Sequence, residues 1–187
     1  MARSRIDSRR KLLRAAEKVT YRRGFGNAAL ADIAKEARVP LGNVYYYFKT
    51  KDEIGDAVVQ ERVARLRMLL QELDKADSPG ERLCGFVQLK VDNAEQLARS
   101  GCPVGTLCSE LHKQGGRVAK KSTALFAEAL AWMETQFKTL GKGGDSCGLA
   151  VHLMSALQGV AVLAHTFNDP GLIASEAKRL KEWIRAM

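Results

Sequence analysis

Two metal-binding side chains of this 187-residue sequence stand four residues apart. If residues 103–114 form a helix, Cys108 and His112 share one face and can donate to the same ion. A zinc or copper site needs at least one or two more ligands, and the sequence does not place Cys147, His152 or His165 beside this pair. We therefore expect no bound metal, and a metal-responsive protein is kept as an alternative.

Thiol chemistry is the second possibility. Cys102 stands just before a predicted helix start, where a thiolate is stabilised, and either Cys102 or Cys108 could serve as a redox switch. The four cysteines, which include Cys84 and Cys147, are widely scattered. In a reducing compartment the default is four free and mostly buried thiols.

Catalytic motifs are absent from the sequence. It has three histidines and no HExxH motif, Gly-rich phosphate loop or GxSxG elbow. Ser109, Glu110 and His112 fall on one predicted helix, which is not a catalytic arrangement. We expect neither enzyme activity nor a cofactor, and we assign no catalytic residues.

The positive charge is confined to one end of the chain. The formal net charge is +9, and residues 1–51 contain thirteen Lys and Arg against four Asp and Glu. The remaining residues contain equal numbers of both signs. A basic module joined to a neutral body predicts a polyanionic partner, with nucleic acid as the first choice and an anionic membrane surface as the second.

The apolar periodicity predicts an all-α protein. Apolar residues make up 46% of the chain, only four prolines interrupt it, and no alternating strand-like runs occur. Capping boxes at Thr50–Glu53 and Ser78–Glu81 mark two helix starts. We expect about nine helices, over residues 6–23, 29–37, 40–47, 51–76, 79–100, 103–114, 118–140, 146–167 and 170–187.

The second and third predicted helices have the features of a helix-turn-helix. They are short, they are joined by a tight turn, and the second of such a pair can lie in the major groove of DNA. Apolar residues at helical spacing supply the small core that fixes their angle: Leu30, Ile33, Ala34, Val39, Val44 and Phe48. Tyr45 is expected in the same core.

A dense set of residues over positions 6–54 forms a recognisable pattern: Gly24-Phe25, Leu30-Ala31-Asp32-Ile33-Ala34, Val39, Gly42, Val44 to Lys51, and Glu53. With this pattern the N-terminal quarter resembles the DNA-binding head of the TetR family of transcriptional repressors. Residues 101–111 are also similar to a motif of a subgroup that senses small molecules. The resemblance implies a helix-turn-helix DNA-binding domain over residues 1–50 and a larger helical effector-binding and dimerisation domain over residues 51–187.

The resemblance also implies which residues contact DNA. Carried onto this chain, they are Arg5, Leu41, Gly42, Asn43, Tyr46, Tyr47, Lys49 and Lys51. Asn43 is the expected base reader because its amide can bond an adenine edge in two places. Lys51, at a helix N-terminus, is expected to pair with a phosphate.

Two residues depart from the family pattern. Ala28 and Ala29 stand where Ser or Thr commonly caps the second helix, so Asn27 is the expected cap. Arg38 stands where glycine is common in the turn, which places an arginine in a position that favours a left-handed backbone.

The C-terminal body is expected to hold the effector and the dimer contact. The pocket candidates are Leu70, Phe86, Leu107, Cys108, Leu111, Phe126, Trp132, Met133 and Met154, which favour a mostly apolar ligand. The family resemblance places the dimer contact on the last two helices, with Leu149, Leu153, Ala156, Gly159, Val160 and Leu163. A twofold dimer predicts a pseudo-palindromic operator.

The resulting hypothesis is a dimeric, ligand-responsive repressor in the cytoplasm. The apolar run Leu149–Ala164 contains polar residues and is expected to be too short to cross a bilayer of about 30 Å, so no membrane partner is expected. A redox- or metal-responsive regulator and a constitutive architectural DNA binder are the alternatives. The architectural protein is disfavoured because bending DNA does not need a large neutral body.

Overall fold

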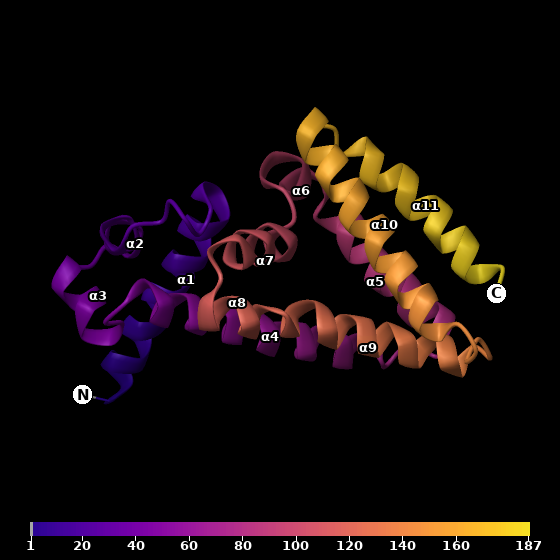
Figure 1. Cartoon of the computed structure of the whole chain (residues 1–187), viewed down its shortest axis with the longest axis horizontal. Coiled ribbons are helices and arrows are strands. Elements are labelled where there is room, and N and C mark those ends of the chain that lie inside the picture. The colour runs from indigo at the N-terminus through magenta and orange to yellow at the C-terminus, as the bar shows by residue number, and fades with distance from the viewer. Residues whose placement is uncertain (1) are drawn as a thin grey trace. The chain divides into compact units, whose positions relative to one another are not determined.

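The computed structural model describes the backbone of residues 2–187 and the side chains of residues 8–187. This part of the chain forms eleven α-helices and no β-strand, which confirms the all-α fold (Figure 1). The helices are α1 (Ala2–Arg23), α2 (Leu30–Ala37), α3 (Leu41–Tyr47), α4 (Lys51–Leu73), α5 (Pro79–Asp92), α6 (Ala94–Ser100), α7 (Pro103–Gln114), α8 (Gly116–Ser122), α9 (Ala124–Thr139), α10 (Ser146–Phe167) and α11 (Gly171–Arg185).

Two of the nine expected helices are each divided in two. The first break is at Asn93, whose side-chain amide donates to the carbonyl of Leu89 at 2.8 Å and so ends α5. The second is at Thr123, where the hydroxyls of Ser122 and Thr123 donate to carbonyls three residues earlier, each at 2.7 Å. These side chains compete with the backbone for hydrogen bonds, and the apolar spacing does not reveal that competition.

The chain divides into two compact units. The first contains residues 1–64 and 106–123, and the second contains residues 65–105 and 124–187. These units are defined by how the helices pack. The boundary expected between residues 50 and 51 separates a DNA-binding function from an effector-binding function, and it stays a prediction.

The first unit is built around α1, α2 and the start of α4. Leu12 and Ala16 of α1, Ile33 of α2 and Val44 of α3 are all buried, as their helical spacing predicts. Residues 54–59 of α4 are buried on every side. A Cβ added at Gly55 would lie 2.9 Å from the Phe25 ring, so this glycine permits the close packing of α4 against that ring.

The second unit is a helical bundle with one large apolar core. Helices α5, α9, α10 and α11 pack against one another in it (Figure 1). The fully buried members of its core include Leu83, Val87, Met133, Phe137, Leu153 and Leu157. A smaller cluster joins α6 to α10 through Leu97 and Ala161.

Helix α10 is longer than the apolar run that marks it in the sequence. It has 22 residues, or about 33 Å at 1.5 Å per residue, so the expectation that it is too short to cross a bilayer is wrong. Its most apolar window has a mean hydropathy of 1.7, and only 39% of that window is buried. Length and composition alone therefore fit either a membrane span or a helix whose outer face contacts another protein.

The turn between α2 and α3 holds Arg38 in a left-handed conformation, as the sequence predicts. Its backbone has φ 55° and ψ 48°, and its N–H donates to the carbonyls that end α2. Side chains with a Cβ rarely adopt this region because the Cβ approaches the following carbonyl oxygen. The turn therefore stores strain that glycine would not have.

We expect Arg38→Gly to stabilise the protein by about 0.5 kcal/mol. Removing the left-handed strain gains about 1–2 kcal/mol, and the greater freedom of glycine in the unfolded chain costs about 0.5–1 kcal/mol. Urea unfolding followed by circular dichroism measures the difference. Arg38→Ala is the control, because it removes the same side chain and keeps the strain. A glycine variant no more stable than the alanine variant would contradict this account.

Candidate nucleic-acid interface

The start of α2 is capped by an acidic residue rather than by Asn27. The carboxylate of Asp32 accepts from the Ala29 N–H at 3.3 Å and pairs with Arg23 at 2.8 Å. The Asn27 amide donates instead to the carbonyl of Arg23 at the end of α1. The prediction that Asn27 caps α2 is therefore wrong, because Asn27 lies close enough to α1 to cap its C-terminal end.

Helix α3 is anchored by one face and exposes the other. Val44 and Phe48 are buried, whereas Leu41, Gly42 and Asn43 at its start are exposed. A Cβ added at Gly42 would meet nothing within 4 Å, so the surface there is open. This arrangement leaves the exposed side of α3 available to the edges of base pairs.

The tyrosine run of α3 lies mostly outside the core. Tyr45 is 48% exposed and Tyr46 is 57% exposed, so the expectation that Tyr45 packs in the core is wrong. Tyr45 lies about 100° around the helix from Val44, and Phe48 follows the end of α3, so Val44 alone sets which side of this helix faces the core. Tyr47 is half-buried and meets the Tyr46 ring edge-on, with centroids 5.0 Å apart.

The junction between α3 and α4 is held by hydrogen bonds to its own backbone. The hydroxyl of Thr50 accepts from the Glu53 N–H at 3.2 Å, as the capping box predicts. The carboxylate of Glu53 reaches one residue further back and accepts from the Lys49 N–H at 2.7 Å. The exposed Lys49 side chain is therefore carried on a fixed segment of backbone.

Lys51 has a partner inside the protein. Its ammonium group donates to the carbonyl of Gly26 at 2.7 Å and lies 5.1 Å from the centre of the Phe25 ring. A hydrogen bond and a cation–π contact therefore join the start of α4 to the turn between α1 and α2. The phosphate contact expected of Lys51 stays a prediction.

Helix α7 also contacts this turn. The Gly26 N–H donates to the carboxylate of Glu110 at 3.2 Å. A Cβ added at Gly24, which has φ 80°, would lie 2.7 Å from that carboxylate. The family motif marks Gly24-Phe25 in the sequence, but Glu110 lies 84 residues beyond Gly26, and no local pattern pairs it with the turn.

Helix α8 forms ion pairs with a buried carboxylate of α4. Asp56 is 8% exposed, and one of its oxygens lies 2.5 Å from Arg117 and 2.9 Å from Lys121. Two cations on a carboxylate that is largely withdrawn from water make a strong ionic contact. Sequence reasoning missed Asp56 because its partners are 61 and 65 residues away.

The structure divides the expected effector residues between the two units. Leu70, Phe86, Met133 and Met154 belong to the core of the second unit, and Phe126 and Trp132 pack against it. Leu107, Cys108 and Leu111 are buried in the first unit. Their role in effector binding stays a prediction.

The thiols and histidines keep separate partners in the described part of the chain. The Cys108 thiol donates to the carbonyl of Ser122 at 3.5 Å, and a ring nitrogen of His112 lies 2.9 Å from the Cys108 carbonyl. The sulfur of Cys102 accepts from the Gly105 N–H at 3.4 Å. Among these residues no three side chains gather as a metal site. Burial raises the pKa of the Cys84 thiol, which keeps it protonated.

The expected dimer residues fall on two sides of α10. Leu153 and Val160 are buried within the unit, and Leu149 and Ala156 are half-buried. Gly159 and Leu163 are exposed. The large apolar side chains of Val151, Val162 and Phe167 on the same helix are exposed as well. The expected DNA contact Arg5 lies outside the residues whose side chains are described.

Known proteins resemble this chain, and one relative matches it over 97% of its length. The family described as "Bacterial regulatory proteins, tetR family" matches residues 12–58. The uncharacterized HTH-type transcriptional regulator YxaF of Bacillus subtilis is 29% identical over 97% of both chains. An uncharacterized HTH-type regulator of Lactococcus lactis is 30% identical over 65% of this chain and 64% of its own length.

A further relative and one crystal structure extend the comparison. The HTH-type transcriptional repressor NemR of Escherichia coli is 30% identical over 56% of this chain, which spans about half of its length (54%). A regulator structure from Chloroflexus aurantiacus matches with a TM-score of 0.86, covering 98% of this chain and 96% of its own. At 18% identity that match establishes the fold alone.

Proposed function

The chain belongs to the TetR family and is an HTH-type transcriptional regulator, not an enzyme, and from this premise we propose a dimeric repressor that a small molecule releases from its operator. Members of this family bind operator DNA and act as dimers. Repression is supported by the name of the relative NemR, which is a repressor. The operator is proposed to be pseudo-palindromic because twofold symmetry presents two identical recognition helices.

The main support for this proposal is the exposed face of α3. Val44 and Phe48 fix the helix in the core, and Asn43 and Tyr46 point away from it. An amide and a phenol on an anchored helix supply hydrogen bonds to base edges and to phosphates. Lys49 adds a nearby positive charge.

The dimer contact is proposed to lie on the outer face of α10. Val162 is 64% exposed, Leu163 is 51% exposed and Phe167 is 68% exposed. Several large apolar side chains exposed on one helix are unfavourable in water, and a second copy of the same helix would cover them. Gly159 on this face would let two helices approach closely. This contact also accounts for the low burial of an apolar helix without a membrane.

Effector release is proposed to act through α7. Leu107 and Leu111 on this helix are candidate ligand neighbours, and Glu110 on the same helix holds the Gly26 N–H. A ligand that shifts α7 would therefore move the turn between α1 and α2, which Lys51 also holds. A coupling of about 1–3 kcal/mol between the two sites is enough for useful regulation. The ligand is proposed to be mostly apolar.

One sequence of experiments tests the whole proposal. Operators are selected from random DNA with the purified protein, and the mass of the complex is measured by sedimentation. A thermal-shift screen of small molecules then finds stabilising compounds, which are tested for release of the operator. We expect one dimer on an inverted repeat, released by at least one compound. A monomer on an asymmetric site would contradict the dimer, and operator binding that no stabilising compound changes would contradict effector control.

Asn43→Ala should weaken operator binding by about 10- to 100-fold per half-site. This change corresponds to the roughly 1–3 kcal/mol of a bidentate contact to a base. Binding to non-specific DNA should change less than twofold, since phosphate contacts supply it. Fluorescence anisotropy with both DNAs measures the two effects, and equal weakening on both would remove Asn43 as a base reader. The side chain is exposed, so the unfolding midpoint should not move.

Glu110→Ala should uncouple the effector from DNA. The effector should still bind, but the ratio of operator Kd values with and without it should fall by at least half. Calorimetry gives the effector affinity, and anisotropy gives the operator affinity. Lys113→Ala, an exposed change on the same helix, is the control and should keep the full ratio. A normal ratio in Glu110→Ala would show that coupling follows another route.

A thiol sensor is the second candidate, and the surroundings of Cys102 favour it over Cys108. The Lys90 ammonium lies 4.0 Å from the Cys102 sulfur, and the Gly105 N–H also donates to that sulfur. Both donors would stabilise negative charge on the sulfur. With a peroxide, the thiolate would form an S–O bond while the O–O bond breaks, giving a sulfenic acid and hydroxide, which takes up a proton to become water.

Hydrogen peroxide distinguishes this candidate from a ligand-only regulator. If Cys102 is the sensor, peroxide weakens operator binding, dithiothreitol restores it, and Cys102→Ser resists the change. Cys108→Ser should respond like the wild type, because the Cys108 thiol is engaged with a carbonyl. A Cys102→Ser variant as sensitive as the wild type would eliminate the thiol sensor.

A further inference from the structure

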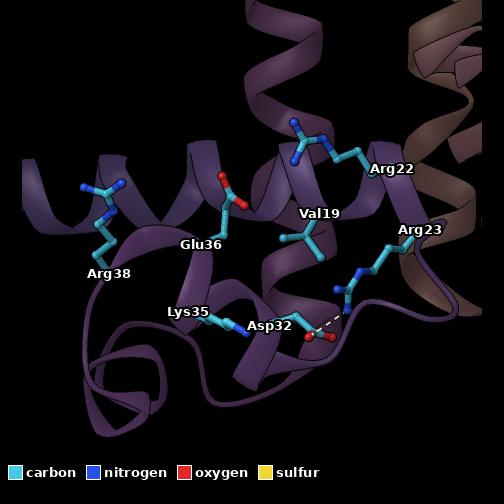
Figure 2. A pocket seen from close by; sticks show the side chains of 7 residues that line it. All are labelled: Val19, Arg22, Arg23, Asp32, Lys35, Glu36 and Arg38. Atoms are coloured by element: carbon cyan, nitrogen blue, oxygen red, sulfur yellow. Dashed lines mark ion pairs between the residues drawn. The ribbon is translucent and has the colours of Figure 1, made fainter. Parts of the chain in front are cut away.

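A basic groove runs between α1 and α2 of the first unit. Two adjoining hollows form it, of about 340 and 220 Å³, and both include Glu36 in their walls. Figure 2 shows the larger hollow, with Arg22 and Arg23 on α1 and Lys35 and Arg38 at the end of α2. Neither hollow is lined by a residue of α3.

The groove carries a large excess of positive charge. Seven basic and two acidic side chains line the two hollows together. Both acids are already paired, Glu36 with Lys18 and Asp32 with Arg23. The hydrogen bond from Lys18 lowers the pKa of Glu36, so it remains ionised. Five cations have no ion-pair partner among the described side chains: Lys11, Arg14, Arg22, Lys35 and Arg38.

Four of the seven cations form one row along α1. Lys11, Arg14, Lys18 and Arg22 recur every three or four residues, so they share a face and span about 17 Å. Like charges at this spacing repel and weaken a helix. Among the described side chains, only Glu36 of the neighbouring helix forms an ion pair with this row, through Lys18. A row that costs stability and has little internal compensation is suited to an anionic partner with regularly spaced charges.

We propose that this groove binds the phosphate backbone of DNA that flanks the base pairs contacted by α3. The inference rests on the proposed function, since operator binding by α3 brings DNA to the same compact unit. Each strand of duplex DNA carries one negative charge for about every 3.4 Å of the helix axis, so one strand can meet several cations of the row. The cations on α1 and α2 then form a second, sequence-independent contact beside the recognition helix.

The lining favours DNA over an acidic protein segment. Its only apolar side chains are Ala15, Val19 and Ala37, and it contains no aromatic residue. Protein partners are usually held by large apolar or aromatic anchors in dry pockets, which this groove does not offer. Protein–DNA contacts are more polar and much more positive, and water bridges many of them. Open, charged hollows match that description.

Two duplexes with the same operator test the proposal. The short one ends at the outer edges of the two half-sites, and the long one continues for about one helical turn on each side. Binding of the full-length protein to each is measured by fluorescence anisotropy over a range of salt concentrations. The test variant is Arg14→Gln/Arg22→Gln. The control is Lys113→Gln/Lys120→Gln, which removes two exposed charges from α7 and α8.

The wild type and the control should bind the long duplex about tenfold more tightly than the short one, with a steeper salt dependence. The Arg14→Gln/Arg22→Gln variant should bind the short duplex as tightly as the wild type does. It should lose most of the additional affinity that the wild type has for the long duplex. The salt slope of the variant on the long duplex should fall by about 0.9 for each phosphate that it no longer neutralises.

The outcomes separate this proposal from operator binding itself. If the wild type binds both duplexes equally, the groove holds no flanking DNA and is left for an acidic protein partner or for solvent. If the variant keeps the flank-dependent affinity, the flanking DNA is bound elsewhere on the head. If even the short duplex is not bound in preference to random DNA, the proposed operator recognition fails first. The unfolding midpoint of the variant, which should match that of the wild type or exceed it, excludes misfolding as the cause.

Discussion

The peptide of Gly26 is held from two helices at once. Its carbonyl accepts from the Lys51 ammonium of α4, and its N–H donates to the Glu110 carboxylate of α7. Gly24 lets the carboxylate approach because a Cβ there would collide with it. The turn that sets α2 and α3 on α1 is therefore fixed by segments that are distant in sequence. The angle at which α3 is presented depends on these two polar contacts as well as on the apolar core beneath.

The polar contacts at Gly26 would suit the movement proposed for this turn. A hydrogen bond to a charged group is worth about 1.5–3 kcal/mol and depends steeply on distance, whereas an apolar core tolerates only rearrangements that keep it packed. The apolar core of the head, with Leu12, Val44 and Phe48 fully or almost fully buried, keeps the helices together in any state. The contacts at Gly26, and the pairs that Asp56 makes with α8, can lengthen without opening that core.

Local sequence rules predicted the features that local chemistry decides. The Thr50–Glu53 cap, the left-handed Arg38 and the buried face of α2 follow from residue type and spacing within a few positions. These rules did not predict the exposure of Tyr45, because in a helix of only seven residues the apolar spacing does not decide which side faces the core. They did not predict the hydrogen bond of Glu110 to Gly26, because the two residues are 84 positions apart. Contacts between distant segments are fixed only when the helices pack, and single-sequence periodicity carries no information about them.

Helix α10 shows how one apolar sequence can serve two surfaces. Leu153 and Leu157 face the core of the second unit, while Val151 and Val162 lie on the opposite side. A helix that buries one face ordinarily has a polar back, and periodicity identifies the buried stripe by that contrast. In α10 the contrast is weak, so the sequence indicates an apolar helix without saying which side faces inward. For the same reason the composition of α10 is also compatible with a membrane span. A second copy of the helix, in the contact proposed above, would cover this exposed apolar face without a lipid environment.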